Sequence, residues 1–169
     1  MPTITIRPAT PGDIGLILDL VRELAEYERE PGAAVATPEQ MRRALFGDPA
    51  RDGKGAGIAE CVMGEVDGVP AGFALFFHNF STWTGRPGIY LEDLFVRPHA
   101  RGVGLGKALL KHLARIAVER GCGRFQWSVL DWNTPAIDFY KSLGAEAMDE
   151  WTVYRVHEEA LTRLAAEGG

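Results

Sequence analysis

The stretch IYLEDLFVRPHARGVGLGKALLKHLARIAVER, residues 89–120, carries three consecutive signals that decide the fold. Residues 89–96 are rich in aromatic and branched side chains, which is typical of a buried strand. Pro98 is expected to end this strand before a glycine-rich segment at 101–107. Apolar side chains then recur at helical spacing, at Leu105, Leu109, Leu113, Ile116 and Ala117. This order predicts an anion site, because glycines allow close backbone approach and a helix N-terminus adds partial positive charge.

The glycine spacing after the strand excludes two familiar phosphate-binding motifs. A Walker A loop needs a serine or threonine after its Gly-Lys pair, and here Ala108 follows. A dinucleotide fingerprint that starts at Gly102 needs a glycine in place of Lys107. What remains is an Arg-x-x-Gly-x-Gly pattern that begins at Arg101 and ends at Gly106. The alternative interpretation is a glycine-rich structural turn before a core helix.

Composition and charge are those of an ordinary globular protein. The chain of 169 residues is 46% hydrophobic and 24% charged, which fits a single domain over residues 1–169. A net charge of −5 argues against nucleic-acid binding, which favours a basic face. No apolar run reaches the roughly 18 residues of a membrane span, and no secretory signal pattern is visible. We therefore expect a cytoplasmic protein without nucleic-acid or membrane partners.

The cysteines and histidines follow no metal-binding pattern. Cys61 and Cys122 lie far apart and form no Cys-x-x-Cys motif, so we interpret both as reduced, buried thiols. The four histidines lack the spacing of metal ligands, and we expect no metal.

The rest of the chain alternates between strand and helix signals. Strands are expected at 3–7, 59–66, 69–77, 124–130 and 150–156, and helices after an Asp13 cap, after a Thr37 capping box, after a Thr134 cap and at 158–166. Asp67-Gly68 predicts a two-residue hairpin turn, and the segments 48–57 and 79–88 predict surface loops. The order predicts an α/β domain with a mixed central sheet flanked by helices.

A second pattern joins the glycine-rich loop. Residues 133–145 read NTPAIDFYKSLGA and resemble the Asn-x-x-Ala-x-x-Phe-Tyr-x-x-x-Gly hallmark of the GCN5-related N-acetyltransferase (GNAT) superfamily. The Arg-x-x-Gly-x-Gly pattern resembles that superfamily's acetyl-CoA pyrophosphate loop. The resemblance implies the GNAT fold, with an acyl-CoA-binding strand–loop–helix, and acetyl-CoA as co-substrate. The cofactor-binding residues that it implies are Leu94, Phe95, Val96, Arg101, Gly102, Val103, Gly104, Leu105, Gly106, Lys107, Asn133, Ala136 and Tyr140.

The same resemblance suggests two catalytic residues. It places the Tyr140 hydroxyl beside the cofactor sulfur, and a phenol can protonate the thiolate that leaves when an amine attacks a thioester. The amine must first lose a proton, and Glu92, in the strand before the loop, is the best candidate acceptor. Glu92 as catalytic base and Glu92 as binder of the substrate cation are equally supported. The alternative for Tyr140 is a core aromatic residue beside Phe139.

Segments along nearly the whole chain resemble the diamine branch of the superfamily, which includes spermidine/spermine and thialysine N-acetyltransferases. The residues that carry this resemblance lie in the segments 6–10, 23–28, 83–85, 90–96, 132–133 and 137–141. The branch implies a homodimer and an acceptor amine held by acidic residues. The substrate-binding residues that we expect are Tyr27, Glu28, Glu92, Gln126, Trp127 and Ser128. From the sequence alone, Tyr27 and Glu28 also fit a frayed, charged helix end.

The chain departs from the polyamine enzymes of the branch at two positions. Thr82 and Thr152 stand near positions where those enzymes carry acids. Fewer carboxylates should weaken binding of a long polycation, which favours a shorter amine such as a lysine-like amino acid. Arg86 or a backbone nest is a candidate holder of that amino acid's carboxylate.

These patterns favour an acetyl-CoA-dependent N-acetyltransferase that acts on a primary amine of a small molecule, by direct transfer in a ternary complex. One alternative is an acyl-CoA-binding regulatory module without catalysis. Another is a protein or peptide N-acetyltransferase, which would share the cofactor site and differ in the acceptor groove.

Overall fold

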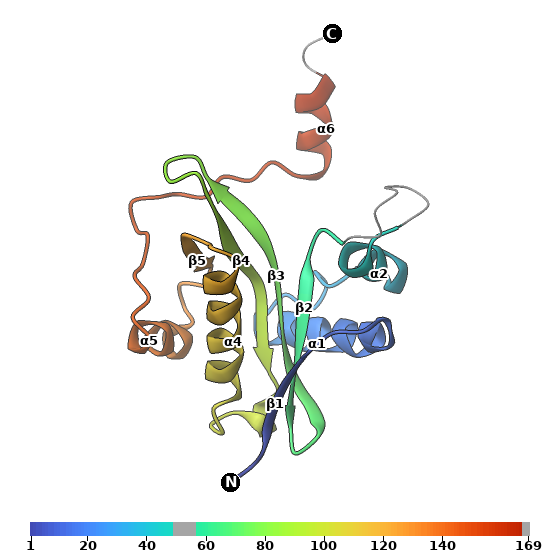
Figure 1. The fold of residues 1–169 in the computed structure, drawn as a ribbon. Helices are drawn as coiled ribbons and strands as arrows, with labels where there is room; N and C mark the ends of the chain where they lie inside the picture. Colours follow the sequence, from blue (N-terminus) through green and yellow to red (C-terminus); the bar gives the residue numbers. More distant parts are fainter. Residues whose placement is uncertain (49–56, 167–169) are drawn as a thin grey trace. The chain divides into compact units, whose positions relative to one another are not determined.

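The computed structural model describes residues 1–48 and 57–166, which form two compact units (Figure 1). Unit 1 is Met1–Leu130 and unit 2 is Asp131–Gly169. The surface loop predicted at 48–57 lies mostly outside the described residues. A single domain over the whole chain stays a prediction.

Unit 1 is built on a five-stranded sheet with the order β1-β2-β3-β4-β5. Its strands are β1 Ile4–Pro8, β2 Glu60–Val66, β3 Val69–Ser81, β4 Arg86–Val96 and β5 Arg124–Trp127. Its helices are η1 Pro11–Asp13, α1 Ile14–Tyr27, α2 Pro38–Phe46, η2 Pro98–Ala100 and α4 Leu105–Glu119. The first four strands pair antiparallel and only β4 and β5 pair parallel. The predicted mixed sheet with flanking helices is therefore confirmed.

The two faces of the sheet are covered by different helices. The helices α1 and α2 pack against one face of the sheet. The buried core between them and the sheet contains Ile14, Ile17, Leu18, Leu20, Leu24, Leu45, Cys61, Met63, Phe73 and Phe95. The neighbour of Met63 on the opposite face is Gly64, and a side chain there would meet Leu105 of α4 at 2.8 Å. Thus α4 lies across the sheet from α1 and α2 (Figure 1). The helix α4 buries Leu105, Leu109 and Leu113 completely, as its apolar spacing predicts.

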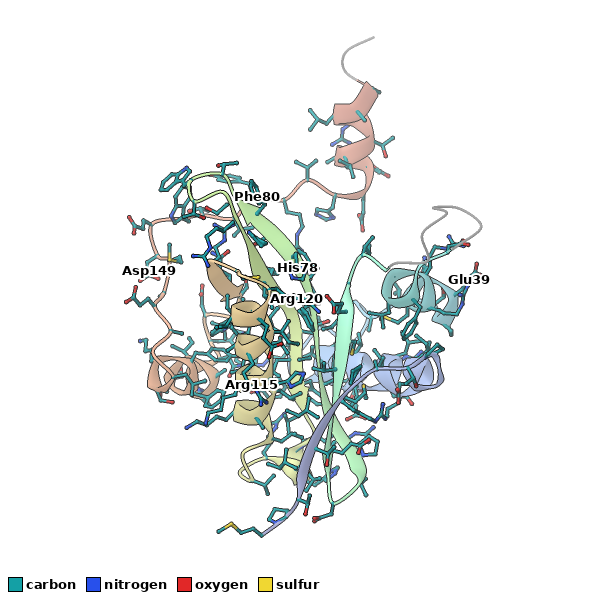
Figure 2. The ribbon with its side chains drawn as sticks, viewed as in Figure 1. Glu39, His78, Phe80, Arg115, Arg120 and Asp149 are labelled. Carbon is teal, nitrogen blue, oxygen red and sulfur yellow. The ribbon has the colours of Figure 1, made fainter. Side chains whose placement is uncertain are left out.

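The far end of α4 is also joined to the sheet. Arg120, the C-cap residue, donates from Nη2 to Glu60 Oε2 on β2 at 2.8 Å, and its Nη1 lies 3.4 Å from His78 Nε2 on β3 (Figure 2). This contact stabilises the helix end opposite to the glycine-rich loop.

The hairpins of the sheet agree only partly with the sequence patterns. The predicted Asp67-Gly68 turn is confirmed, since both residues have left-handed φ values of 51° and 78°. The loop expected at 79–88 is wrong at both ends, because β3 and β4 continue as a long hairpin whose outermost pair is Ser81↔Arg86. The polar side chains of this segment led to the loop prediction. The strands nevertheless pair through backbone hydrogen bonds, which depend little on side-chain hydrophobicity. Trp83, at the tip, is exposed as expected.

Asp13 does not use its side chain as the predicted helix cap. It precedes α1 but forms no side-chain bond to the first turn. Instead its carboxylate accepts two hydrogen bonds from Arg7 on β1, at 2.8 and 2.9 Å, and others from the backbone N–H and hydroxyl of Thr10. The Arg7 guanidinium holds the pKa of this buried carboxyl well below its usual range. Arg7 also donates to Glu65 on β2, so the cluster joins the start of α1 to two strands.

Unit 2 contains two helices, α5 Thr134–Ser142 and α6 Glu158–Ala166. The N-cap of α5 is Asn133, whose side chain accepts from the Ala136 N–H at 3.4 Å, and not Thr134 as predicted. The strand predicted at 150–156 is wrong, since the described residues 151–157 have neither helical nor strand structure. A strand requires a neighbour to pair with, and the described part of unit 2 supplies none.

Candidate active site

The parallel pair of strands β4 and β5 separates partway along β4. Their pairing runs from Gly88↔Arg124 to Leu91↔Trp127 and stops there, while β4 continues to Val96 along β3. The strand predicted at 124–130 is correspondingly shorter, since β5 ends at Trp127. In the described part of the chain, residues 92–96 therefore have a paired strand on one side only. The other edge of this segment has no paired strand among the residues that the structure describes. Its Val96 carbonyl accepts from Arg101 Nε, and the remaining backbone groups there are candidates for the predicted cofactor contacts at Leu94, Phe95 and Val96.

Glu92 lies in a β-bulge at this point of separation. The register of β3 and β4 shifts so that Leu91 pairs with Phe76 and Asp93 pairs with Leu75. Glu92 is therefore the extra residue of β4, and its side chain is exposed. Bulges often re-aim a side chain beside a functional site. Regular alternation along a strand would place Glu92 and Asp93 on opposite faces, and the extra residue interrupts that alternation.

Asp93 is a candidate site residue that the sequence interpretation did not select. Burial first, and then the charges of Glu92 and Glu28, raise the pKa of Asp93 to about 6. Partial burial also raises the pKa of Glu28, although that residue is exposed as a whole. Three carboxylates from the end of α1 and the bulge of β4 thus form one electrostatic cluster, the acid cluster. Two adjacent acids inside an apolar strand were the available signal.

The Cys61 thiol lies beneath this cluster on β2. It is buried, and burial, Asp13 and Asp93 together raise its pKa to about 12, so it is a neutral thiol near pH 7. Among the residues that the structure describes, no group of three or more His, Cys, Asp or Glu side chains is placed to hold a metal ion.

The predicted pyrophosphate loop has the geometry of a backbone anion site. Gly102 and Gly104 adopt left-handed φ values of 81° and 96°, which a glycine accepts without strain. Gly104 is the N-cap of α4 and has no side chain with which to satisfy the free N–H groups of the first turn. An anionic ligand can satisfy them, and the positive end of the 15-residue helix favours negative charge.

Arg101 connects this loop to the end of α1. Its Nε donates to the Val96 carbonyl at 2.9 Å, and its guanidinium carbon lies 4.7 Å from the centre of the Tyr27 ring. A second ring, Phe95, lies 5.8 Å from the same carbon. These distances fit cation–π interactions. Tyr27 is thus the ordered last residue of α1, and the frayed helix end considered from the sequence is not observed.

The residues expected on β5 do not share one face. The Gln126 side chain accepts from Asn79 at 3.1 Å, and the Ser128 hydroxyl lies 2.8 Å from the Tyr90 hydroxyl. Trp127 instead packs on Phe125, with ring centres 4.9 Å apart. Gln126 and Ser128 therefore line one face of the sheet, and Trp127 belongs to the other.

Arg86 is committed to the fold rather than available for a substrate carboxylate. Its guanidinium donates to the carbonyls of Gly121 and Cys122, at 3.1 and 3.4 Å. This contact joins the start of β4 to the turn that follows α4.

In unit 2, α5 carries the remaining predicted residues. Asn133, buried at its N-terminus, caps the helix, and Ala136 supplies the N–H that the cap accepts. The ring centres of Tyr140 and Phe139 lie 5.6 Å apart, with the rings tilted. Gly144, after the helix, has a left-handed φ of 85°.

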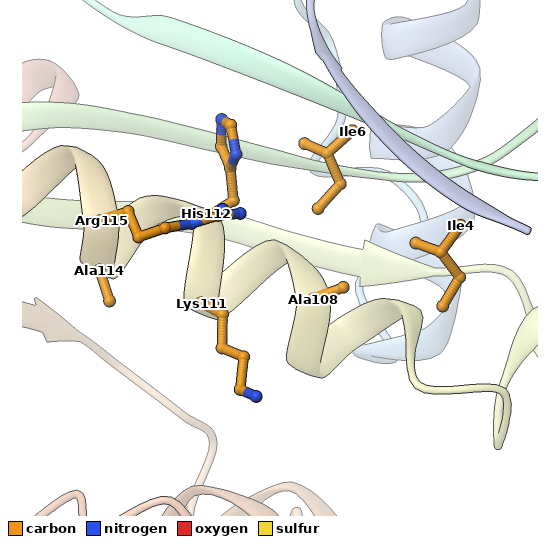
Figure 3. Close-up of a pocket in the computed structure, with 7 residues that line it drawn as sticks. All are labelled: Ile4, Ile6, Ala108, Lys111, His112, Ala114 and Arg115. Carbon is orange, nitrogen blue, oxygen red and sulfur yellow. The ribbon is translucent and has the colours of Figure 1, made fainter.

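A groove lies between β1 and α4, next to the glycine-rich loop, since its lining residue Ile4 is the neighbour of Gly104 (Figure 3). It has a volume of about 620 Å³ and is lined by Ile4, Ile6, Ala108, Lys111, His112, Ala114 and Arg115. None of these side chains belongs to the loop, the acid cluster or α5.

Comparison with known proteins agrees with this arrangement of strand, bulge, loop and helix. The pattern of the acetyltransferase (GNAT) family matches residues 19–145. The chain belongs to the acetyltransferase (GNAT) family. It is an N-acetyltransferase, and its co-substrate is acetyl-CoA. The resemblance found in the sequence is thereby confirmed.

The similar proteins include several with named acceptors. Thialysine N-epsilon-acetyltransferase from Sus scrofa is 38% identical over 99% of this chain and 100% of its own length. L-ornithine N5-acetyltransferase from Arabidopsis thaliana is 31% identical over 94% of this chain and 86% of its own length. A spermidine/spermine N(1)-acetyltransferase-like protein from Homo sapiens is 32% identical over 99% of this chain and 24% of its own length. These likenesses support acetylation of a small-molecule amine.

Solved structures share the fold. An integron cassette protein from V. cholerae superposes with a TM-score of 0.76 at 28% identity, over 96% of this chain and 97% of the other. An aminoglycoside acetyltransferase from a soil metagenome gives a TM-score of 0.72 at 16% identity, over 92% of this chain and 95% of the other. At that identity the likeness concerns the fold alone.

The raised pKa of Asp93 predicts that this residue reduces stability at neutral pH. A carboxyl whose folded pKa exceeds its unfolded value stabilises the fold below the unfolded pKa, and this contribution is lost as the pH rises through about 6. We expect Asp93→Asn to have a higher free energy of unfolding than the native chain at about pH 8. This advantage of the variant should be about 2 kcal/mol larger at about pH 8 than at about pH 4.5. Urea unfolding at both pH values checks this. Asp19→Asn, at an exposed position of α1, is the control, and a gain independent of pH would contradict the prediction.

Proposed function

We propose that this enzyme acetylates the terminal amine of a small, lysine-like amino acid, by direct transfer from acetyl-CoA in a ternary complex. The observation that carries the proposal is the acid cluster of Glu28, Glu92 and Asp93 beside the open end of β4. Clustered carboxylates attract a cationic amine, and the split strands leave backbone groups free for a thioester. Relatives named for thialysine and L-ornithine support an amino-acid acceptor.

The acetyl-CoA site is proposed on the residues that the sequence pattern selected. The amides of 101–107 would hold the pyrophosphate, and the edge of β4 from Leu94 to Val96 would hold the pantetheine arm. Asn133 and Ala136, at the start of α5, would contact the same arm. When bound, acetyl-CoA supplies an activated acetyl group on a thioester.

The acceptor amine must lose a proton before it attacks. Glu92 is exposed at the bulge, and we propose that it accepts this proton directly or through water. Asp93 and Glu28 add negative charge beside it, which attracts the cationic substrate. The amine nitrogen then forms a bond to the acetyl carbon as the carbon–sulfur bond breaks. Tyr140 is proposed to protonate the departing thiolate.

We propose that the enzyme works as a homodimer, which the likeness to the diamine branch supports, and sedimentation equilibrium tests the dimer. We also propose a cytoplasmic location without nucleic-acid or membrane partners, from the net charge and the sequence pattern. In the described ranges, every helix is too short or too polar to cross a membrane.

The first test is acetyl-CoA consumption with a panel of acceptors: thialysine, L-ornithine, spermidine and a lysine-containing peptide. We expect kcat/KM for the amino acids to exceed that for spermidine by about 10-fold, the value of about one favourable charge contact. Preference for spermidine would contradict the amino-acid acceptor. Turnover of the peptide alone would indicate a protein acetyltransferase, and cofactor binding without any turnover would indicate a regulatory module.

Glu92→Gln tests the base. The amide keeps the shape of the side chain and removes its charge. If Glu92 accepts the proton, the variant's kcat/KM should lose its acidic limb and recover at high pH, where the amine is already neutral. A higher KM with little change in kcat would make Glu92 a cation binder instead. Glu39→Gln, on the exposed surface of α2, is the control.

Tyr140→Phe tests the acid. The substitution deletes one hydroxyl and keeps the ring that packs beside Phe139. We expect kcat to fall by about 10²- to 10⁴-fold, the usual contribution of general-acid catalysis, with little change in acetyl-CoA affinity. The loss should be smaller with an acetyl thioester whose thiol is more acidic, because its thiolate leaves without a proton. A variant that keeps near-full kcat would remove Tyr140 from the mechanism.

A further inference from the structure

Two side-chain contacts join α1 to the segment between β4 and α4. Glu23 accepts hydrogen bonds from the Arg97 guanidinium at 2.7 to 3.1 Å. One helical turn later, the Tyr27 ring lies against the Arg101 guanidinium at 4.7 Å. Since Arg97 and Arg101 are also four residues apart, on either side of η2, the two contacts run in parallel between the same two segments. We name them the Glu23–Arg97 clamp and the Tyr27–Arg101 clamp.

The Tyr27–Arg101 clamp begins at the first residue of the pyrophosphate loop. Arg101 is fixed at three points, namely the Val96 carbonyl, the Tyr27 ring and the Phe95 ring. Its own backbone belongs to the loop whose amides would receive the cofactor. A ligand that orders the loop therefore also orders the guanidinium.

At the other end of the clamp, α1 ends in a defined backbone motif. The Glu30 N–H donates to the Ala25 carbonyl at 2.8 Å and the Arg29 N–H donates to the Glu26 carbonyl at 3.1 Å. These two bonds, with Arg29 at a left-handed φ of 67°, form a Schellman motif. Glu28 lies inside this motif, directly after Tyr27, so it moves with the Tyr27 backbone.

We infer that the Tyr27–Arg101 clamp couples the pyrophosphate loop to the acid cluster, so that cofactor and acceptor amine strengthen each other's binding. The inference rests on the proposed function and makes Arg101 a positioning residue for Glu28. The first ligand further restrains the loop, the clamp and the end of α1, and the second ligand then binds at a lower entropic cost. The coupling is reciprocal, since each ligand changes the affinity of the other by the same factor.

The Glu23–Arg97 clamp provides the matched control. Arg97 precedes the loop, and Glu23 lies one turn before the end of α1. Loss of this ion pair weakens the same packing of α1 without touching either binding region. If general loosening of α1 reduces the coupling, loss of either clamp should reduce it. If the link through Arg101 carries the coupling, only loss of the Tyr27–Arg101 clamp should reduce it.

The test measures the affinity for CoA, which cannot transfer an acetyl group, by calorimetry with and without saturating thialysine. For the native chain we expect thialysine to lower the Kd for CoA by about 5- to 20-fold, within the usual range of coupling between sites. In Tyr27→Leu and in Arg101→Gln the factor should fall below about 2. In the double variant the coupling factor should fall no further than in either single variant, because the two substitutions break the same contact. Glu23→Gln should keep the native factor.

A direct role of either residue in ligand binding has its own signature. Arg101→Gln should leave the Kd for thialysine alone unchanged while it abolishes the enhancement by CoA. Arg101→Lys, which keeps the charge and loses the planar stacking group, should lose most of the factor as well. A native factor near 1, or variants that keep the full factor, would overturn the inference and leave acetyl transfer intact. Failure of the native chain to bind CoA at all would instead overturn the proposed function.

Discussion

The site in unit 1 depends on the point where β4 and β5 stop pairing. A continuous parallel ladder would consume every backbone group of β4, and no polar edge would remain for a ligand. Separation after Leu91↔Trp127 leaves residues 92–96 of β4 paired on one side, and the bulge at Glu92 begins at the same place. The strand is held there by its other neighbour, β3, and by the α1 core beneath it. Thus β3 stabilises β4 on one side, and the other side of β4 provides the unpaired edge.

The surrounding charges are arranged in two zones. Paired charges hold elements together, as Arg7 does with Asp13 and Glu65, and Arg97 does with Glu23. The acid cluster is different, because burial and two neighbouring carboxylates together raise the pKa of Asp93. Uncompensated charge of one sign is a cost to the fold, and such costs tend to persist at functional sites. This contrast identifies the acid cluster more clearly than its composition does.

The sequence predicted most of what is local and little of what requires a neighbour. The order of strands and helices in unit 1, the Thr37 capping box and the Asp67 turn follow from patterns within a few residues. The strand expected at 150–156 depended on a pairing partner, and the outer ends of β3 and β4 depended on each other. Candidate site residues came from motif spacing, so the loop at 101–107 was readily found. The contact of Arg101 with Tyr27 depends on the position of α1, which no local pattern reports, and the raised pKa of Asp93 depends on its burial in the folded sheet.

Gly64, on β2, governs how close α4 approaches the sheet. Leu105, the first residue of that helix, occupies the space that a side chain on β2 would fill. The depth at which the helix begins is therefore set by a missing methyl group. Even alanine here would act as a spacer beneath the helix, lifting its first turn and the amides beside it. A substitution at this position would therefore weaken cofactor binding, although its direct effect is on the spacing between α4 and the sheet.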